Sequence, residues 1–282
     1  MERPSVVKIH ESLHIHKRIK LLVEKYLDLN GIHHIWEIGA LDGSDSVALK
    51  TFFPKALFTA FEPTPTSFQI VIKNLESIGG NAFQYAIALE DSSTSFFVND
   101  SEKTVTTWID GNQGANSMFR ANLEYPIEQY FQNEITVEAK RADTLISKGL
   151  TCPNLLWIDA QGSELNILRS FGKNLDNVDF IYTELSLFPI YKDAPLAEEI
   201  INFLWTQGFY WVTNLTTGGF QFDAVLIRVK KKRFIATIKH RYFTYSLHTK
   251  SKLYISTNLR QLIRAKLGRY AKSTLRLLNN KP

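Results

Sequence analysis

Carboxylates and glycines stand where apolar segments of this sequence end, in a spacing that suits a nucleoside ligand. Glu37 lies within the apolar segment 34–39, and Gly39 and Gly43 interrupt the chain directly after it. The next apolar segment closes with Glu62, about 20 residues beyond Gly43. Glycines allow backbone N–H groups to approach a ligand, and an acidic residue at that distance accepts hydrogen bonds from ribose hydroxyls. The alternative is an ordinary strand-to-helix turn followed by a surface glutamate.

The residues around the turn favour S-adenosylmethionine (SAM) over a dinucleotide. Gly39 and Gly43 lack the third glycine of dinucleotide sites, and Asp42 and Asp45 would repel a pyrophosphate at a helix N-terminus. A sulfonium ligand with a free amino group tolerates these carboxylates, and Glu37 could accept from that amino group, directly or through water. An NAD-dependent oxidoreductase is the weaker alternative. We expect SAM to be held by residues of the first three strands and their turns, namely Glu37, Gly39, Ala40, Gly43, Ser44, Glu62, Pro63 and Ala86.

A second set of carboxylates could remove a proton from a methyl acceptor. Methyl transfer from a sulfonium to a hydroxyl requires alignment of the two groups and a base. Asp159 and Glu184 each stand near the end of an apolar segment, and Glu164 follows Asp159 at the start of an expected helix. We predict that Asp159, Glu164 and Glu184 are catalytic, although Glu164 would also suit a helix N-terminus and Glu184 a loop anchor. A magnesium ion between Asp159, Glu184 and Asp143 is an open alternative, but no metal ligand is assigned.

The order of apolar segments predicts an α/β fold with a mostly parallel sheet. Helices and strands alternate at both ends of the chain, whereas residues 91–150 combine two strand-like segments with a polar glycine loop, 110–117, that could form a lid or an ordinary surface loop. Aromatic residues near this loop could form a wall for a sugar or pack in the core; they are Trp108, Phe119, Tyr125 and Tyr130. Three histidines are expected on the exposed side of the first helix; they are His10, His14 and His16. The expected helices are 10–31, 45–53, 65–80, 163–175 and 195–209, and the expected strands are 34–39, 56–63, 81–89, 154–162, 179–186, 210–215 and 220–229, the last two antiparallel.

Five segments together resemble one family, the FkbM-type SAM-dependent methyltransferases. They are WEIGALDGSDS, AFEPTP, ADTLI, LLWIDAQGSELNILRSFG and YTELSLFPIYKDAPLAEEIINFLWTQGF, and the resemblance runs from about residue 35 to residue 228. It implies a class I methyltransferase fold, which is a Rossmann-like seven-stranded, mostly parallel sheet with its last strand antiparallel and helices on both faces. It also implies O-methylation of a hydroxyl on a sugar, polysaccharide or other natural product. Three positions depart from the family motifs: Glu37 replaces Asp, Leu41 replaces Asn, and Gln161 replaces Glu.

Charge divides the chain into a body and a basic tail. The segment 228–282 holds 16 Lys and Arg and no Asp or Glu. We predict an N-terminal helical cap over 1–33, a SAM-binding domain over 34–229 and a basic, helical extension over 230–282. The extension could contact an anionic membrane, the acidic body or a second subunit, and nucleic acid is the least favoured partner.

Composition and the termini suggest where the protein acts. The single cysteine excludes a disulfide within the chain, and neither a signal peptide nor a membrane span is recognisable, so a cytoplasmic location, with contact to the inner face of the membrane, is expected. The alternative to an enzyme is a non-catalytic methyltransferase-fold module that its basic tail brings to a membrane or nucleic acid.

Overall fold

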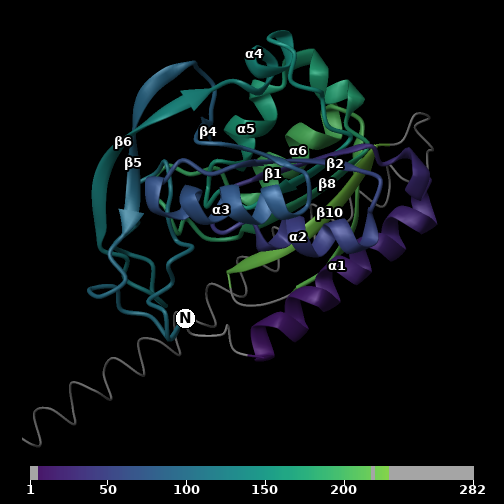
Figure 1. Cartoon of the computed structure of the whole chain (residues 1–282). Coiled ribbons are helices and arrows are strands. Elements are labelled where there is room, and N and C mark those ends of the chain that lie inside the picture. The colour runs from purple at the N-terminus through teal and green to yellow at the C-terminus, as the bar shows by residue number, and fades with distance from the viewer. Residues whose placement is uncertain (1–5, 217–219, 229–282) are drawn as a thin grey trace, which may run out of the picture.

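A seven-stranded sheet forms the centre of the fold (Figure 1). The computed structural model describes residues 6–216 and 220–228. The strand order is β3-β2-β1-β7-β8-β10-β9, in which every neighbouring pair is parallel except the two pairs made by β10. This topology confirms the predicted class I sheet with its last strand antiparallel. The strands are β1 (His34–Ile38), β2 (Leu57–Phe61), β3 (Asn81–Phe83), β7 (Leu155–Ile158), β8 (Phe180–Ser186), β9 (Phe209–Asn214) and β10 (Gln221–Arg228).

Helices cover both faces of the sheet, as predicted (Figure 1). On one face, Ile19, Leu49 and Leu75 from three helices share a core with the sheet, and on the other face Leu165 and Ile201 do the same. The first group of helices is α1 (Val6–Tyr26), α2 (Ser44–Phe52) and α3 (Pro65–Ser77), and the second is α4 (Ala142–Ser147), α5 (Glu164–Ser170) and α6 (Ala197–Thr206). Both faces of β1 and β7 are therefore buried, which explains why β7 is apolar throughout and why β1 is apolar apart from the buried His34 and Glu37.

The segment between β3 and β7 forms a second, three-stranded sheet. Its order is β4-β6-β5, and it lies beside the main sheet (Figure 1). The predicted single strand 81–89 is thus wrong, because the chain leaves the main sheet after Phe83 and pairs with β6 at Ala86. The strands are β4 (Ala86–Ile87), β5 (Ser92–Asn99) and β6 (Gln132–Lys140). The residues between β5 and β6, 100–131, are called the insertion below.

Four predicted helices end earlier than the sequence suggested: 65–80 ends at Ser77, 195–209 ends at Thr206, and two others end at 3-10 segments. The helix 10–31 ends at Tyr26 and a short 3-10 turn, Leu29–Gly31, follows it, with the Asp28 side chain accepting from the N–H of Asn30. The helix 163–175 ends at Ser170 and is followed by the 3-10 segment Gly172–Asn177. These changes shorten the helices without altering which elements are adjacent.

His16 is buried, so the expectation that it faces solvent is wrong. Its side chain is 1% exposed, its ring stacks on Trp157 with centroids 5.0 Å apart, and its Nε2 lies 2.8 Å from Asp45 Oδ1. Helix α1 is thereby fixed to the start of α2 and to the end of β7.

The basic extension 230–282 and its expected helix lie outside the described residues. Among the residues that are described, no helix is long and apolar enough to cross a membrane.

Candidate active site

A cavity lies at the carboxyl ends of β1, β2 and β7. In a parallel sheet of this topology, ligands bind at this edge. Of the predicted site residues, Gly39, Glu62, Pro63, Ala86 and Asp159 line the cavity. The other predicted cofactor residues, Glu37, Ala40, Gly43 and Ser44, do not.

The cavity also has walls that sequence reasoning missed. Phe96, Asn116 and Met118 come from β5 and the insertion, and Ser163 comes from the start of α5. The polar glycine loop 110–117 therefore contributes directly to the cavity, which supports its interpretation as a lid. The pairing of β5 with β6 and the bridge between Phe97 and Ser117 bring the first three of these residues to the site, and the β5–β6 pairing joins segments more than 30 residues apart.

Glu62 is held rigidly at the end of β2. Its Oε2 accepts from the N–H of Leu41 at 2.9 Å, and its Oε1 accepts from the N–H and hydroxyl of Thr64 at 2.8 and 2.5 Å. A carboxylate offers about four acceptor positions, so one remains for a ligand in the cavity. Burial raises the pKa of Glu62, while the three donors act in the opposite direction.

The glycines of the turn are required by the protein's own packing. Gly39 has φ +84°, and a Cβ there would lie 1.9 Å from the backbone oxygen of Asp159. Gly43 has φ +74°, and a Cβ would lie 2.9 Å from Leu75 Cδ2 on α3. The glycine at 39 thus lets β1 and β7 meet, whereas the sequence interpretation assigned both glycines to close approach of a ligand. Leu41 between them also has a positive φ of 51°, which is unusual for a leucine.

Glu37 does not line the cavity and is bound by the start of α2 instead. Its side chain is buried, and Oε2 accepts from the N–H of Ser46 at 3.1 Å and from the Ser46 hydroxyl. Burial raises the pKa of Glu37 well above its usual value, and Asp45 raises it further. Glu37 therefore fixes the start of α2, and its predicted contact with a cofactor amino group stays a prediction.

Asp159 directly follows β7, Glu184 lies on the neighbouring strand β8, and the two share one donor. The Gln161 side-chain amide donates to Asp159 Oδ1 at 2.7 Å and to Glu184 Oε2 at 3.0 Å. A second amide, from Gln221 on β10, donates to Glu184 Oε2 at 2.6 Å. Gln161, one of the departures from the family motifs, connects two of the predicted catalytic residues.

Burial and like charges make these carboxyl groups weak acids. Burial raises the pKa of Asp159 to about 7; Gln161 lowers it, and Asp223, Glu164 and Asp45 raise it. Burial also raises the pKa of Glu184 well above its usual value, followed by the effect of Asp159. A base with a pKa near 7 matches proton transfer at neutral pH.

Glu164 and Asp143 lie in different surroundings. Glu164 Oε1 accepts from the N–H groups of Ala160 and Gly162 at 3.1 and 3.2 Å, which holds the loop after β7. Asp143 forms an ion pair with Arg141 at 2.6 Å and does not join Asp159. Within the described ranges, no three His, Cys, Asp or Glu residues are grouped so that they could hold a metal ion.

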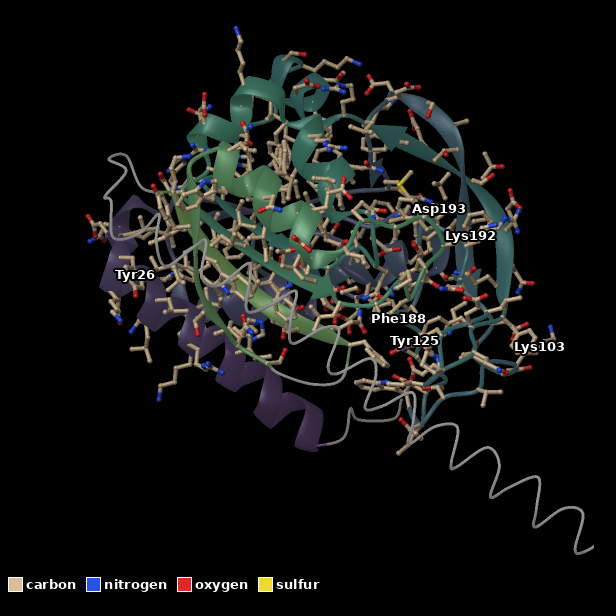
Figure 2. All side chains as sticks on the ribbon, turned by 180° about the vertical axis from the view of Figure 1, so that it is seen from behind. Tyr26, Lys103, Tyr125, Phe188, Lys192 and Asp193 are labelled. Carbon is tan, nitrogen blue, oxygen red and sulfur yellow. The ribbon has the colours of Figure 1, made fainter. Side chains whose placement is uncertain are left out.

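The insertion contacts the loop that carries Gln161. The Ser117 hydroxyl donates to the backbone oxygen of Gln161 at 2.7 Å. Tyr191, which follows β8, has its hydroxyl 2.9 Å from Gln161 Oε1 and 3.3 Å from the backbone oxygen of Ala115 in the insertion. Tyr125 stands beside Phe188 at this edge, with ring centroids 6.0 Å apart (Figure 2). Tyr125 and Tyr130 are buried in one aromatic cluster, so the core-packing alternative holds for them.

Comparison with known proteins identifies related sequences. The model of the methyltransferase FkbM domain matches residues 37–210. The 2-O-methyltransferase NoeI of Sinorhizobium fredii is 28% identical over 195 residues, covering 68% of this chain and 77% of that protein. The hexuronic acid methyltransferase AglP of Haloferax volcanii is 24% identical over 174 residues, which cover 59% of this chain and 64% of that protein. A structure of the O-methyltransferase from Bacillus cereus in complex with SAH superposes with a TM-score of 0.41 at 14% identity. The superposition covers 76% of this chain and 80% of that chain.

Proposed function

The chain belongs to the FkbM family of methyltransferases, and from that premise we propose that it methylates a hydroxyl of a sugar or glycan with SAM. The observation that carries the proposal is the position of Asp159, which lines the cavity, has a pKa near 7 and is held by Gln161. The names of two relatives, a 2-O-methyltransferase and a hexuronic acid methyltransferase, support a sugar as the acceptor.

The residues of the cavity fit SAM. Glu62 keeps an acceptor position for a ribose hydroxyl, and Phe61, Tyr85 and Phe96 offer apolar surface for a base. The Ser163 hydroxyl lies on the cavity wall, is buried, and has no hydrogen-bond partner in the protein. A polar atom in that state favours a polar ligand, because an unsatisfied buried hydroxyl costs about 1–3 kcal/mol.

The protein's own part in the reaction is alignment and proton removal. The bound cofactor supplies a methyl group that is already activated as a sulfonium. Asp159 is proposed to accept the hydroxyl proton of the acceptor, Gln161 to hold Asp159 and Glu184 in place, and Glu184 to position the acceptor through a hydrogen bond. Glu164 is proposed to support the loop after β7 without touching the substrate.

Magnesium does not fit this arrangement. Asp143 is engaged by Arg141, and the Gln161 amide stands between Asp159 and Glu184, where a shared cation would lie. We therefore assign no step to a metal.

The extension 230–282 is proposed to hold the enzyme at the cytoplasmic face of an anionic membrane, on its charge alone. Co-sedimentation with vesicles containing phosphatidylserine tests this. A homo-oligomer is a further proposal, which light scattering tests.

Binding and turnover test the function separately. SAM and S-adenosylhomocysteine should raise the melting temperature, and Glu62→Ala should remove the shift. Transfer of labelled methyl groups to glycans should fail with Asp159→Asn while SAM binding persists. A shift with NAD but none with SAM would contradict the proposal. SAM binding without transfer to any acceptor would favour the non-catalytic module.

A further inference from the structure

We propose that the hydroxyl of Ser163 and the side-chain amide of Asn116 bind the adenine ring of SAM, so that the insertion takes part in selecting the cofactor. This inference rests on the proposed function and concerns the same cavity. Neither residue is among those that the sequence predicts for the site.

Ser163 has a hydroxyl that the rest of the protein does not use. The residue lies directly before α5, where a serine commonly accepts a hydrogen bond from the first N–H groups of the helix, yet its side chain forms no such bond. The residue is 2% exposed, and its Oγ is buried without a hydrogen-bond partner among the described residues. A buried hydroxyl is unfavourable unless it is hydrogen-bonded. Because Ser163 lines the cavity, its hydroxyl is placed to bind a ligand there.

Asn116 offers hydrogen-bond donors to the same cavity. Its Oδ1 accepts from the backbone N–H of Asn99 at 2.8 Å, which sets the orientation of the amide. The two N–H groups on its Nδ2 have no acceptor in the part of the chain that the structure describes. Asn116 lines the cavity, so these donors are available to an acceptor atom of a ligand.

Hydrogen bonds hold the segments that carry the two residues together. Phe97 of β5 and Ser117 form an antiparallel bridge, with N···O distances of 2.8 and 3.0 Å. The Ser117 hydroxyl also donates to the backbone oxygen of Gln161, in the loop that leads from β7 to α5. The insertion therefore brings Asn116 to the cavity beside the loop that ends at Ser163.

The surrounding walls suit a flat, uncharged ring. Phe96 and Met118 line the cavity and pack in one cluster with Ala86 of β4. No Lys or Arg stands among the described residues that line the cavity, which favours the adenine end of SAM over its carboxylate end. Adenine has ring nitrogens that accept hydrogen bonds and an amino group that donates them. These groups match the donors of Asn116 and the hydroxyl of Ser163, which can both donate and accept.

The test is calorimetric binding of two ligands to the full chain. The ligands are S-adenosylhomocysteine and 5′-methylthioadenosine, which keeps the adenosine and lacks the amino acid. Ser163→Ala removes the hydroxyl, and Asn116→Asp removes the N–H donors while it keeps the acceptor for Asn99. Each variant should weaken both ligands by the same factor, about three- to tenfold, because the contacts lie in the half that the ligands share.

A serine at the other end of α5 is the matched control for Ser163. The buried Ser170 hydroxyl accepts from the N–H of Ala142 at 3.2 Å, so Ser170→Ala should lower the melting temperature and leave both affinities unchanged. Ser163→Ala should show the opposite behaviour. Its melting temperature without ligand should stay equal to that of the wild type or rise, because its hydroxyl has no hydrogen bond within the described protein to lose.

An asparagine elsewhere in the insertion is the matched control for Asn116. Asn122 accepts from the N–H of Glu124 at 3.0 Å and donates to the backbone oxygen of Pro189 at 2.7 Å, and it does not line the cavity. Asn122→Asp therefore keeps an acceptor and loses a donor, as Asn116→Asp does. It should leave the affinity for both ligands unchanged.

The outcomes separate this inference from the proposed function. Unchanged affinity in Ser163→Ala or in Asn116→Asp would overturn the inference, and so would a loss limited to S-adenosylhomocysteine or an equal loss in Asn122→Asp. In each of these cases the wild type still binds S-adenosylhomocysteine, so the proposed function stands. A wild type that binds neither ligand would contradict the proposed function and the inference together.

Discussion

The bond from Gln161 to Asp159 predicts a measurable shift in the pH dependence of the reaction. The proposed base must be ionised to accept a proton, so kcat/KM should rise with pH through the pKa of Asp159, which is about 7. The Gln161 amide donates to the ionised carboxylate at 2.7 Å and therefore favours the charged form. Gln161→Met has a similar shape and lacks the donor, so the pKa should rise.

The size of the shift follows from the strength of that bond. A hydrogen bond to a charged group contributes about 1.5–3 kcal/mol, and about 1.4 kcal/mol corresponds to one pKa unit. The rise in kcat/KM should therefore move from about pH 7 to between about pH 8 and pH 9. Asp223, Glu164 and Asp45 keep acting on Asp159 in the same direction as the loss of the donor.

The assay is initial-rate methyl transfer between pH 5.5 and 10, with SAM saturating. Gln221→Met is the matched control, because the Gln221 amide donates to Glu184 at 2.6 Å and not to Asp159. Its pH profile should stay close to that of the wild type even if its rate falls. The assignment of Asp159 as the base would be refuted if kcat/KM of Gln161→Met rose at the same pH as that of the wild type. It would also be refuted if the pH of this rise moved equally in both variants.

Four further predictions concern the turn and its supports. Glu62→Gln should weaken SAM binding on the order of ten- to a hundredfold by calorimetry, because an ionised acceptor for the ribose is lost; unchanged affinity would argue against a ribose contact. Leu41→Asn should raise the free energy of unfolding by about 0.5–1 kcal/mol in urea titrations, since asparagine tolerates the positive φ better. Gly39→Ala should lower the free energy of unfolding by about 3 kcal/mol or more, because the Cβ of alanine would overlap the backbone oxygen of Asp159. A variant as stable as the wild type would contradict that geometry. Glu37 has a raised pKa in the folded state, so its contribution to stability is present at low pH and is lost as pH rises; Glu37→Gln should therefore gain melting temperature relative to the wild type between pH 5 and pH 8.

The main sheet could be predicted from the sequence because its signals are local. Each strand of this sheet lies in a short, mostly apolar segment, and the alternation with helices favours parallel order. The second sheet could not be predicted in the same way. Whether Ala86 continues the strand that contains Phe83 or pairs with Ala139 of β6 depends on partners more than 50 residues apart.

Residue types at the site were recognisable, whereas their directions were not. Glu62 and Asp159 were expected on the cavity from their position after apolar segments, and both line it. Glu37 belongs to the same pattern, but its carboxylate bonds to Ser46, and a single sequence contains no signal for that choice. The burial of His16 was missed for a similar reason, since its partners Trp157 and Asp45 come from distant segments.

The departures from the family motifs acquire a physical meaning in this geometry. Position 41 has a left-handed backbone conformation, which asparagine adopts more readily than leucine. The N–H of Leu41 still donates to Glu62, so leucine keeps this hydrogen bond at some cost in backbone strain. Position 161 also has a positive φ, of 49°, and its side chain stands between two carboxylates. A glutamate at 161 would add a third negative charge within hydrogen-bond distance of both, and would raise the pKa of Asp159 unless a cation were bound. Glutamine instead donates a hydrogen bond to each carboxylate, so no cation is needed between them. Both departures, at 41 and at 161, are therefore compatible with an active enzyme whose base ionises near neutral pH.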